Sequence, residues 1–415
     1  MRIVHLGLGN FFRAHQAWYT EQANHLGAQP WSITGVCMRR PHLRDMLVQQ
    51  DCRYTLELSD VAGRELHEIS VLDAVLVASE EPGNVISAIA DGDTAIVTLT
   101  VTEKGYDLKP DGGLNADSPN IRADLEHGTQ SSMVGLLAAA LKARSSKRTP
   151  LTILSCDNLP RNSRQLRQAI LDFSGLAGLG LDEYLEDCVR FPCSMVDRIT
   201  PSTDSELEAR VAKTGLPPRA PVSAEKFTDW IIEDDFAGPR PDWGSVGVSF
   251  VDDVAPFELR KLRMLNGPHC YVAFAGILAG YEFVHEAIVD PAIRAMTETI
   301  MDEAMETLPP ESRVDALEHK ASLLRRFENP FLDHRLRQIT FDGSVKLPIR
   351  VLPVIDARAG MGLSSPGCEA LLTAWRQFLA AEIEAGRDLH DPAALELRQM
   401  VQNGVAALDI LEALK

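Results

Sequence analysis

An amine, an amide and an imidazole occur together in the segment Lys261-Leu-Arg-Met-Leu-Asn-Gly-Pro-His269. Such side chains donate hydrogen bonds to a ligand or exchange protons with it. At about 100° per residue, Asn266 and His269 lie roughly 140° and 80° around a helix from Lys261, so all three could face one cleft. The alternative is that Lys261 is solvated, Asn266 caps a helix break and His269 is a core histidine with satisfied hydrogen bonds.

These three residues lie in a stretch with helical periodicity. Apolar residues recur at three- and four-residue steps over residues 257–282, which predicts one long helix. Pro268 removes the amide hydrogen bond to the Met264 carbonyl, so the helix should kink or restart beside the polar residues. Gly267 leaves room for a neighbouring group.

The first thirty residues have the pattern of a dinucleotide site. An apolar strand over residues 2–6 leads into Gly7-Leu-Gly-Asn-Phe-Phe-Arg-Ala-His15 and then into a helix to about Leu26. The first glycine makes the turn and the second lets backbone approach a pyrophosphate. Phe12 replaces the third glycine, so a tight turn without a ligand is the alternative. With a cofactor bound, the contacts expected in this turn are Gly7, Leu8, Gly9, Asn10 and Phe11.

Residues 31–38 predict a second strand, which ends where such domains present an acid to the adenosine ribose. Here the chain has Arg39 and Arg40, and the first acid is Asp45. The arginines could stack on adenine, meet a 2′-phosphate or be solvated. Arg39 is therefore a candidate cofactor contact, and the choice between NAD and NADP stays open.

Further strands end in polar residues, and the carboxyl ends of parallel strands line the crevice that binds ligands. The strand at 94–102 carries Thr100 and Thr102, which we expect at the cofactor. Asn158 lies at the polar carboxyl end of a strand expected within residues 151–160, and it either hydrogen-bonds a substrate oxygen or the nicotinamide amide, or makes an Asx turn before Pro160. Asp197 follows residues 191–196 and is a substrate or lysine partner, or an ion pair with Arg198.

The whole pattern predicts an α/β protein with a Rossmann-type N-terminal domain over residues 1–250 and a mostly α-helical domain over residues 251–415. Residues 53–77 predict a hairpin or meander outside the parallel sheet, 109–120 a loop, 131–144 and 163–173 helices, and 201–245 a domain junction. The expected C-terminal helices cover residues 257–282, 290–308, 313–327, 331–338, 366–386 and 392–413. An irregular loop at 342–350 is expected to interrupt them, and the basic residues in and before it could hold an anionic or polyhydroxylated substrate: Arg335, Arg337, Lys346 and Arg350.

Composition excludes several classes of protein. The net charge of -18 argues against nucleic acid or anionic membrane as a partner. The seven cysteines include no CxxC pair and the histidines no HExxH, so a zinc site is unsupported. The chain opens on a strand, and no apolar run reaches membrane-spanning length. We expect a cytoplasmic protein, monomer or homodimer.

Taken together, the motifs resemble those of the mannitol dehydrogenase family, the polyol-specific long-chain dehydrogenases that include mannitol 2-dehydrogenase and fructuronate (mannonate) reductase. The resemblance covers nearly the whole chain. It is carried by residues 7–15, Thr-Val-Thr-Glu-Lys-Gly-Tyr at 100–106, Ser-Cys-Asp-Asn-Leu at 155–159, Ser-Met-Val-Asp-Arg-Ile-Thr-Pro at 194–201, Lys261 with Asn266 and His269, and Asp-Gly-Ser-x-Lys-x-Pro at 342–348.

The resemblance implies a nicotinamide cofactor, no metal and a lysine as general base. Lys261 matches that lysine, Asn158 and Asn266 the asparagines that steady the substrate oxygen, His269 the substrate-orienting histidine and Asp197 an aspartate of the polar network. Glu258 matches a glutamate on the route to solvent, and Arg337 and Lys346 fall where the family contacts the far end of the substrate. The chain departs from the family in lacking an N-terminal extension and in having Arg39-Arg40 at the cofactor-selecting position.

The implied chemistry makes a demand on Lys261. A free lysine, with a pKa of about 10.4, is a poor base at neutral pH, so the pocket must lower the pKa by roughly two to three units. The substrate is either a neutral polyol or a sugar acid, and the basic residues slightly favour the fructuronate/mannonate pair. The competing class is a non-catalytic nucleotide-binding sensor, which would not need the lysine, asparagine and histidine set.

Overall fold

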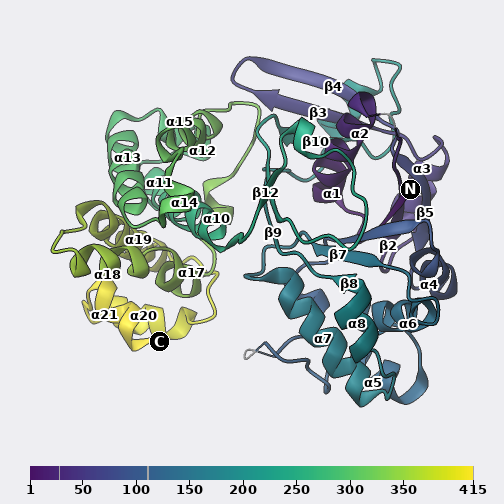
Figure 1. The fold of residues 1–415 in the computed structure, drawn as a ribbon. Coiled ribbons are helices and arrows are strands. Elements are labelled where there is room, and N and C mark those ends of the chain that lie inside the picture. The colour runs from purple at the N-terminus through teal and green to yellow at the C-terminus, as the bar shows by residue number, and fades with distance from the viewer. Residues whose placement is uncertain (28, 110–111, 415) are drawn as a thin grey trace. The chain divides into compact units, whose positions relative to one another are not determined.

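The computed structural model describes residues 1–27, 29–109 and 112–414, so residues 110–111 of the predicted loop lie outside the described residues. The chain divides into two compact units (Figure 1). The first comprises Met1–Leu58 and Arg64–Ala255, and the second Ser59–Gly63 and Pro256–Lys415. None of the described helices is long and apolar enough to cross a membrane.

A six-stranded parallel sheet forms the centre of the first unit. The strand order is β5-β2-β1-β6-β7-β8. The strands are β1 (Arg2–Leu6), β2 (Ser32–Cys37), β5 (Leu72–Val77), β6 (Thr94–Leu99), β7 (Leu151–Ser155) and β8 (Val189–Arg190). The order reverses between β1 and β6, and open parallel sheets bind ligands at the carboxyl ends of the strands at such a switch point. The predicted Rossmann-type sheet is confirmed.

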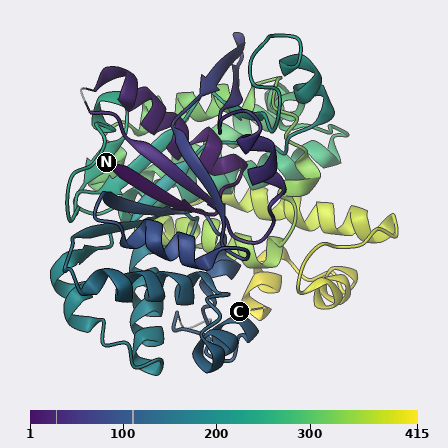
Figure 2. The same ribbon diagram turned by 90° about the vertical axis from the view of Figure 1, so that its right-hand side faces the viewer.

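Both faces of the sheet are buried, as its apolar strands require. On β1, Ile3 packs in the core that contains α1 and α2, whereas Val4 and Leu6 pack in the core that contains α4, α6 and α7. Figure 2 shows helices on both sides of this sheet. The helices of this unit are α1 (Asn10–Ala14), α2 (Gln16–Leu26), α3 (His42–Val48), α4 (Pro82–Ala90), α5 (Pro119–His127), α6 (Met133–Ser145), α7 (Asn162–Leu176), α8 (Asp182–Cys188) and α9 (Ser205–Val211), with 3-10 turns η1 (Glu103–Tyr106) and η2 (Gly244–Val246).

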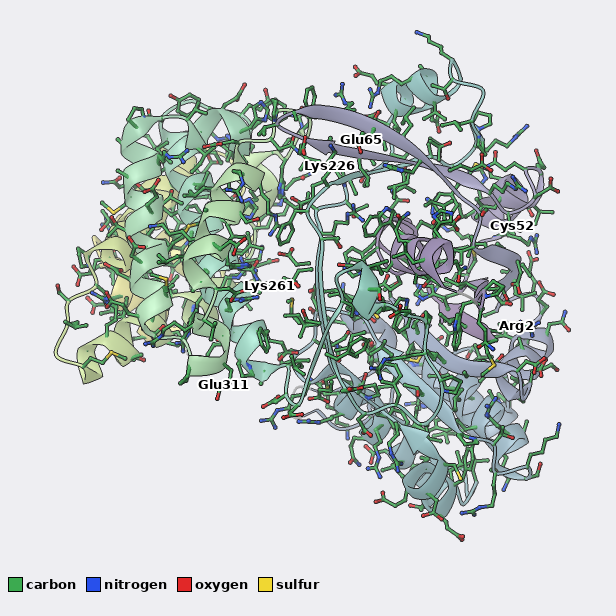
Figure 3. The ribbon with its side chains drawn as sticks, turned by 45° about the horizontal axis from the view of Figure 1, so that its top comes forward. Arg2, Cys52, Glu65, Lys226, Lys261 and Glu311 are labelled. Atoms are coloured by element: carbon green, nitrogen blue, oxygen red, sulfur yellow. The ribbon has the colours of Figure 1, made fainter. Side chains whose placement is uncertain are left out.

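Two three-stranded sheets complete the first unit, in the orders β10-β3-β4 and β12-β11-β9. Their strands are β3 (Tyr54–Asp60), β4 (Gly63–Ile69), β9 (Ser194–Asp197), β10 (Val222–Glu225), β11 (Asp229–Glu233) and β12 (Ser249–Val251). The hairpin β3–β4 is joined to the segment after β10 by an ion pair between Lys226 Nζ and Glu65 Oε1 at 2.7 Å (Figure 3).

Two expectations for these strands were wrong. The prediction placed all of residues 53–77 outside the parallel sheet, but β5 pairs in parallel with β2. Alternation along the chain does not tell a third meander strand from one that crosses to another sheet. The strand that ends at Asp197, β9, belongs to a small sheet and pairs antiparallel with β11.

The second unit is helical, as predicted, and α11 packs against α12, α13, α16 and α19. The helix predicted at 331–338 is wrong over residues 331–335, which are not helical. Its helices are α10 (Ala255–Arg260), π-helix η3 (Lys261–Asn266), α11 (Gly267–Leu278), α12 (Val284–Ile288), α13 (Pro291–Glu306), α14 (Pro310–Arg313), α15 (Ala316–Phe327), α16 (Leu336–Ile339), α17 (Gly343–Arg350), α18 (Leu352–Gly360), α19 (Pro366–Glu384), α20 (Ala394–Gln402) and α21 (Ala407–Ala413).

The predicted irregular loop at 342–350 is wrong, because Gly343–Arg350 form helix α17 with Pro348 inside it. Asp391 accepts hydrogen bonds from Ser344 N at 2.9 Å and from the Ser344 hydroxyl at 2.5 Å. Leu347 is fully buried. These tertiary contacts outweigh the turn preference of Asp-Gly-Ser and the loss of one backbone hydrogen bond at the proline.

Candidate active site

The glycine turn after β1 lies at the switch point of the sheet. Gly7 has a φ of 97°, and a Cβ added there would lie 2.1 Å from the Thr100 carbonyl oxygen. Only glycine fits that position. At Gly9, an added Cβ would meet only the Gly7 oxygen, at 3.7 Å. The space over Gly9 therefore fits the close backbone approach that a dinucleotide pyrophosphate needs.

The position of the missing third glycine is filled by an aromatic stack. Phe12 is fully buried, and its ring lies 3.5 Å from that of His5, nearly parallel to it. His5 Nδ1 lies 2.8 Å from Thr98 Oγ1, and His5 Nε2 lies 3.0 Å from Thr100 Oγ1. Thr100 Oγ1 in turn donates to the Gly7 carbonyl at 3.0 Å, so it accepts the proton of His5 Nε2. The His5 imidazole is thus linked to the glycine turn through the Thr100 hydroxyl.

His5 makes the stability of the protein depend on pH. Burial lowers the pKa of His5 from 6.5 to about 3. Between these values the unfolded chain binds a proton that the native state does not, so the free energy of unfolding falls as pH falls, by up to about 1.4 kcal/mol per pH unit. We expect His5→Gln to remove this contribution. Urea unfolding of both proteins between pH 4 and 7 measures it, and parallel pH profiles would contradict the assignment.

The side chains of most other residues expected at the cofactor contact residues of the first unit. Leu8 is buried against Gly35. Asn10 Oδ1 accepts from Arg13 Nη2 at 2.7 Å, and Asn10 Nδ2 donates to Thr203 Oγ1 at 3.3 Å. The remaining two are Phe11, which stacks on His15, and Arg39, which is exposed. Cofactor contacts by these four residues stay predictions, and the space beside the Cα of Gly9 is the feature that favours a cofactor here.

The carboxyl ends of β6 and β7 are tied together by a residue that the sequence analysis passed over. Asp157 accepts hydrogen bonds from Val101 N at 3.0 Å, Thr102 N at 2.9 Å and Tyr106 Oη at 2.6 Å. Asn158 follows it directly and is exposed. The sequence signal for Asp157 is an acid at the end of an apolar strand, immediately before Asn158.

In the second unit, Lys261 and Asn266 are the first and last residues of a π-helix. Lys261 is labelled in Figure 3. The angles calculated for an α-helix are therefore wrong for this segment, because its hydrogen bonds span five residues, as between Gly267 N and Leu262 O. The predicted restart is confirmed, since Pro268 lies in the first turn of α11. π-Helical segments occur frequently at functional sites.

His269 has a buried nitrogen that no described residue satisfies. Its ring stacks on Phe327 at 5.1 Å and meets His334 edge-on at 4.9 Å, while Nε2 has no hydrogen-bond partner among the described residues. Burial lowers the pKa of His269 well below its ordinary value. His334, Arg350, Arg326 and Lys346 lower it further, in that order. The imidazole is therefore neutral at physiological pH, with one buried nitrogen left without a partner among the described residues.

We call His269, His334, Arg326, Lys346 and Arg350 the basic cluster. Burial, and then the charge of Arg350, lowers the pKa of Lys346. Arg350 Nη1 donates to the Asn266 carbonyl at 3.4 Å and lies 3.3 Å from Cys270 Sγ, which places α17 beside the π-helix. Sequence spacing could not reveal the roles of His334 and Arg326, because they lie more than fifty residues from His269.

The two other basic candidates are already paired with acids. Arg337 Nη1 lies 3.0 Å from Glu382 Oε2, and Arg335 pairs with Glu282. Arg337 lines a cavity of about 430 Å³ whose walls include no member of the basic cluster. A substrate contact by Arg337 stays a prediction.

The remaining candidates are two acids. Glu258 lies in α10, one turn before Lys261, and Asp197 is buried at the end of β9. The Arg198 guanidinium, the alternative partner expected for Asp197, donates to backbone carbonyls, among them that of Glu225 at 2.8 Å. In the described parts of the chain, no three or more His, Cys, Asp or Glu side chains are grouped to hold a metal ion.

Comparison with known proteins agrees with this arrangement. Residues 1–245 match the model of the mannitol dehydrogenase Rossmann domain, and residues 253–414 match that of the mannitol dehydrogenase C-terminal domain. A mannitol dehydrogenase of Saccharomyces cerevisiae is 37% identical over 97% of this chain and 82% of its own. The D-mannonate oxidoreductase of Escherichia coli is 36% identical over 96% of this chain and 84% of its own.

A solved structure extends the likeness to the fold. The mannitol 2-dehydrogenase of Pseudomonas fluorescens, in a ternary complex with NAD and D-mannitol, has a TM-score of 0.83 and 35% identity, and the match covers 100% of this chain and 86% of that one. These relatives are dehydrogenases or oxidoreductases acting on CH–OH groups, which disfavours a non-catalytic sensor. The chain belongs to the mannitol dehydrogenase family of oxidoreductases.

Proposed function

We propose that this protein is a metal-independent, NAD-dependent oxidoreductase of sugar acids, with D-mannonate and D-fructuronate as the favoured pair. The observation that supports this substrate class is the basic cluster, in which Arg350 and Lys346 carry positive charge near enough to lower the pKa of His269. A carboxylate gains from such positive charge and a neutral polyol does not. The 36% identity to the D-mannonate oxidoreductase of E. coli agrees with it.

A second candidate is mannitol 2-dehydrogenase activity on D-mannitol and D-fructose. It is favoured by the P. fluorescens enzyme, whose structure contains D-mannitol and matches all of this chain. The two candidates share the same chemistry at the reacting carbon. They differ only in what holds the far end of the substrate, where Lys346 and Arg337 are the proposed contacts.

In either reaction NAD, when bound, would supply the hydride chemistry. Lys261 removes the hydroxyl proton during oxidation and returns it during reduction. Asn158 and Asn266 donate amide N–H groups to the substrate oxygen, each contributing on the order of 3 kcal/mol to the transition state. Neutral His269 hydrogen-bonds a substrate hydroxyl through Nε2. Glu258 passes the proton to solvent, and Asp197 orients the polar network.

The glycine turn is the proposed seat of the cofactor pyrophosphate, because Gly9 leaves its backbone open. Thr100 adjoins the turn, since its hydroxyl donates to the Gly7 carbonyl, and Thr102 is a further proposed contact of the cofactor. The presence of NAD in the P. fluorescens complex favours NAD. Arg39 is exposed and could meet the 2′-phosphate of NADP, so both cofactors are included in the test.

The experiment is nicotinamide absorbance at fixed enzyme concentration, with NADH and NADPH each offered against D-fructuronate, D-tagaturonate and D-fructose. Oxidation of NADH with a keto acid, and little with D-fructose, is the expected result. Turnover of D-fructose alone would replace the proposal by the second candidate.

Lys346→Ala tests the source of the preference for an acid. We expect it to raise KM for the keto acid roughly tenfold or more, because a charged hydrogen bond is worth about 1.5–3 kcal/mol, and to leave KM for D-fructose nearly unchanged. Arg335→Ala is the matched control, since Arg335 is exposed and paired with Glu282. Equal changes in KM for both substrates would show that Lys346 does not recognise the carboxylate.

A further inference from the structure

We infer that Asp157 is a positioning residue of this reaction, whose carboxylate holds the Thr100–Thr102 segment against the glycine turn and thereby sets the geometry of cofactor binding. The inference rests on the proposed function for the identity of the cofactor. Asp157 itself acts through the backbone that it holds, and it is 9% exposed.

The carboxylate binds backbone on a neighbouring strand. Oδ2 accepts from Val101 N at 3.0 Å and Oδ1 from Thr102 N at 2.9 Å, so the two oxygens hold consecutive residues after β6. Tyr106 Oη donates to Oδ2 at 2.6 Å. Hydrogen bonds to an ionised acceptor are roughly twice as strong as neutral ones. Asp157 therefore fixes the backbone that leaves β6.

That backbone needs such support. Thr102 has a φ of 67° and a ψ of 159°, a conformation that a β-branched residue rarely adopts and that persists only where its surroundings enforce it. Two residues earlier, Thr100 Oγ1 donates to the Gly7 carbonyl at 3.0 Å. The strained residue and the glycine turn are thus parts of one connected segment, and Asp157 is the group that holds the strained end.

The backbone of Asp157 is itself held by hydrogen bonds to Ser155 and Asn162. Its amide donates to Ser155 Oγ at 3.3 Å, and Asn162 Nδ2 donates to its carbonyl at 3.0 Å. Ser155 Oγ lies 2.5 Å from Tyr106 Oη, which closes a ring of contacts around the carboxylate. This support fixes the start of the segment that carries Asn158, so one residue sets both the cofactor turn and the proposed substrate contact.

The contacts require the ionised carboxyl group, because a protonated one loses acceptor capacity. The titratable groups facing Asp157 are Tyr106 and Cys156, and burial raises the pKa of both, so they stay neutral in acid. Burial also raises the pKa of Asp157 above its ordinary value. Cofactor affinity is therefore expected to be full above that pKa and to fall as pH falls through it.

The test measures the Kd of NADH by its fluorescence, across pH 4.5 to 8, for three variants of the full chain. Asp157→Asn keeps the size of the side chain and is expected to raise Kd roughly ten- to a hundredfold and to flatten its pH dependence. Tyr106→Phe keeps both backbone bonds and should give a smaller rise. Asp124→Asn is the matched control, because Asp124 is another buried carboxylate that accepts two backbone amides, from Ser131 and Ser132.

Each outcome is decisive. If the unchanged protein does not bind NADH, the proposed function fails. If it binds and Asp157→Asn keeps the same Kd and the same pH profile, the inference alone is overturned. Equal losses of affinity in Asp157→Asn and Asp124→Asn would show general destabilisation and would also overturn it. Should Asp157→Asn not fold, an unchanged Kd in Tyr106→Phe counts against the inference, and a raised Kd with native thermal stability supports it.

Discussion

Replacing Lys261 by alanine is expected to lower kcat roughly 10²- to 10⁴-fold, the range that a positioned acid–base group contributes. The Kd of NADH should change by less than about twofold, because the glycine turn proposed to hold the cofactor belongs to the other unit of the chain. Pre-steady-state hydride transfer and NADH fluorescence measure the two effects separately. A loss of kcat without a loss of cofactor affinity is the signature of a general base.

Lys320→Ala is the control for the Lys261 variant. Lys320 is a partly buried lysine of the same unit, and its Nζ lies 2.6 Å from Asp302 Oδ1. Its loss should leave kcat unchanged. A Lys261→Ala protein with a rate near that of the unchanged enzyme would end the assignment of Lys261, and the neutral imidazole of His269 would then be the first alternative base to test.

Gly7→Ala is the second change with a large expected effect. The added Cβ would lie 2.1 Å from the Thr100 oxygen, at a φ of 97° that costs an alanine about 1–2 kcal/mol even without a clash. The turn and the end of β6 must move apart, so we expect NADH affinity to fall at least about a hundredfold, with a lower thermal midpoint. Binding and thermal unfolding together check this.

Gly9→Ala distinguishes between two interpretations of the glycine turn, a cofactor site and a tight turn that binds no ligand. Its Cβ would have only one neighbour, at 3.7 Å, and its φ is -126°, so stability should change by less than about 1 kcal/mol. If a pyrophosphate approaches this backbone, affinity nevertheless falls at least tenfold. Unchanged affinity in the Gly9 variant would mean that the turn holds no phosphate.

The sequence predicted the sheet and the glycine turn because their signals are local. Apolar runs mark the strands, and a turn that only glycine can make leaves glycine in the sequence, as at Gly7. The candidate residues could also be picked out from the sequence, since the motifs around Asn158 and Lys261 are contiguous.

The rest depended on contacts between distant residues. The π-helix has the composition of an ordinary helix, and α17 forms against turn-favouring residues because Asp391 and the core stabilise it. The basic cluster joins α11, α15 and α17, and no spacing rule connects His269 to Arg326 or Arg350. The contacts of Asp157 depend on the pairing of β6 with β7, which the sequence does not show.

The π-helix at Lys261–Asn266 sets a limit on how this gene can vary in length. A helix turn with five-residue hydrogen bonds contains one residue more than an α-helical turn of the same register. Deleting any one residue there would let the segment relax to an α-helix, and the side chains between Lys261 and His269 would take other positions around the helix axis. Substitutions such as Leu262→Met keep that register. Natural relatives should accordingly differ here in their amino acids but not in their number, and insertion or deletion libraries should find this stretch among the least tolerant in the chain.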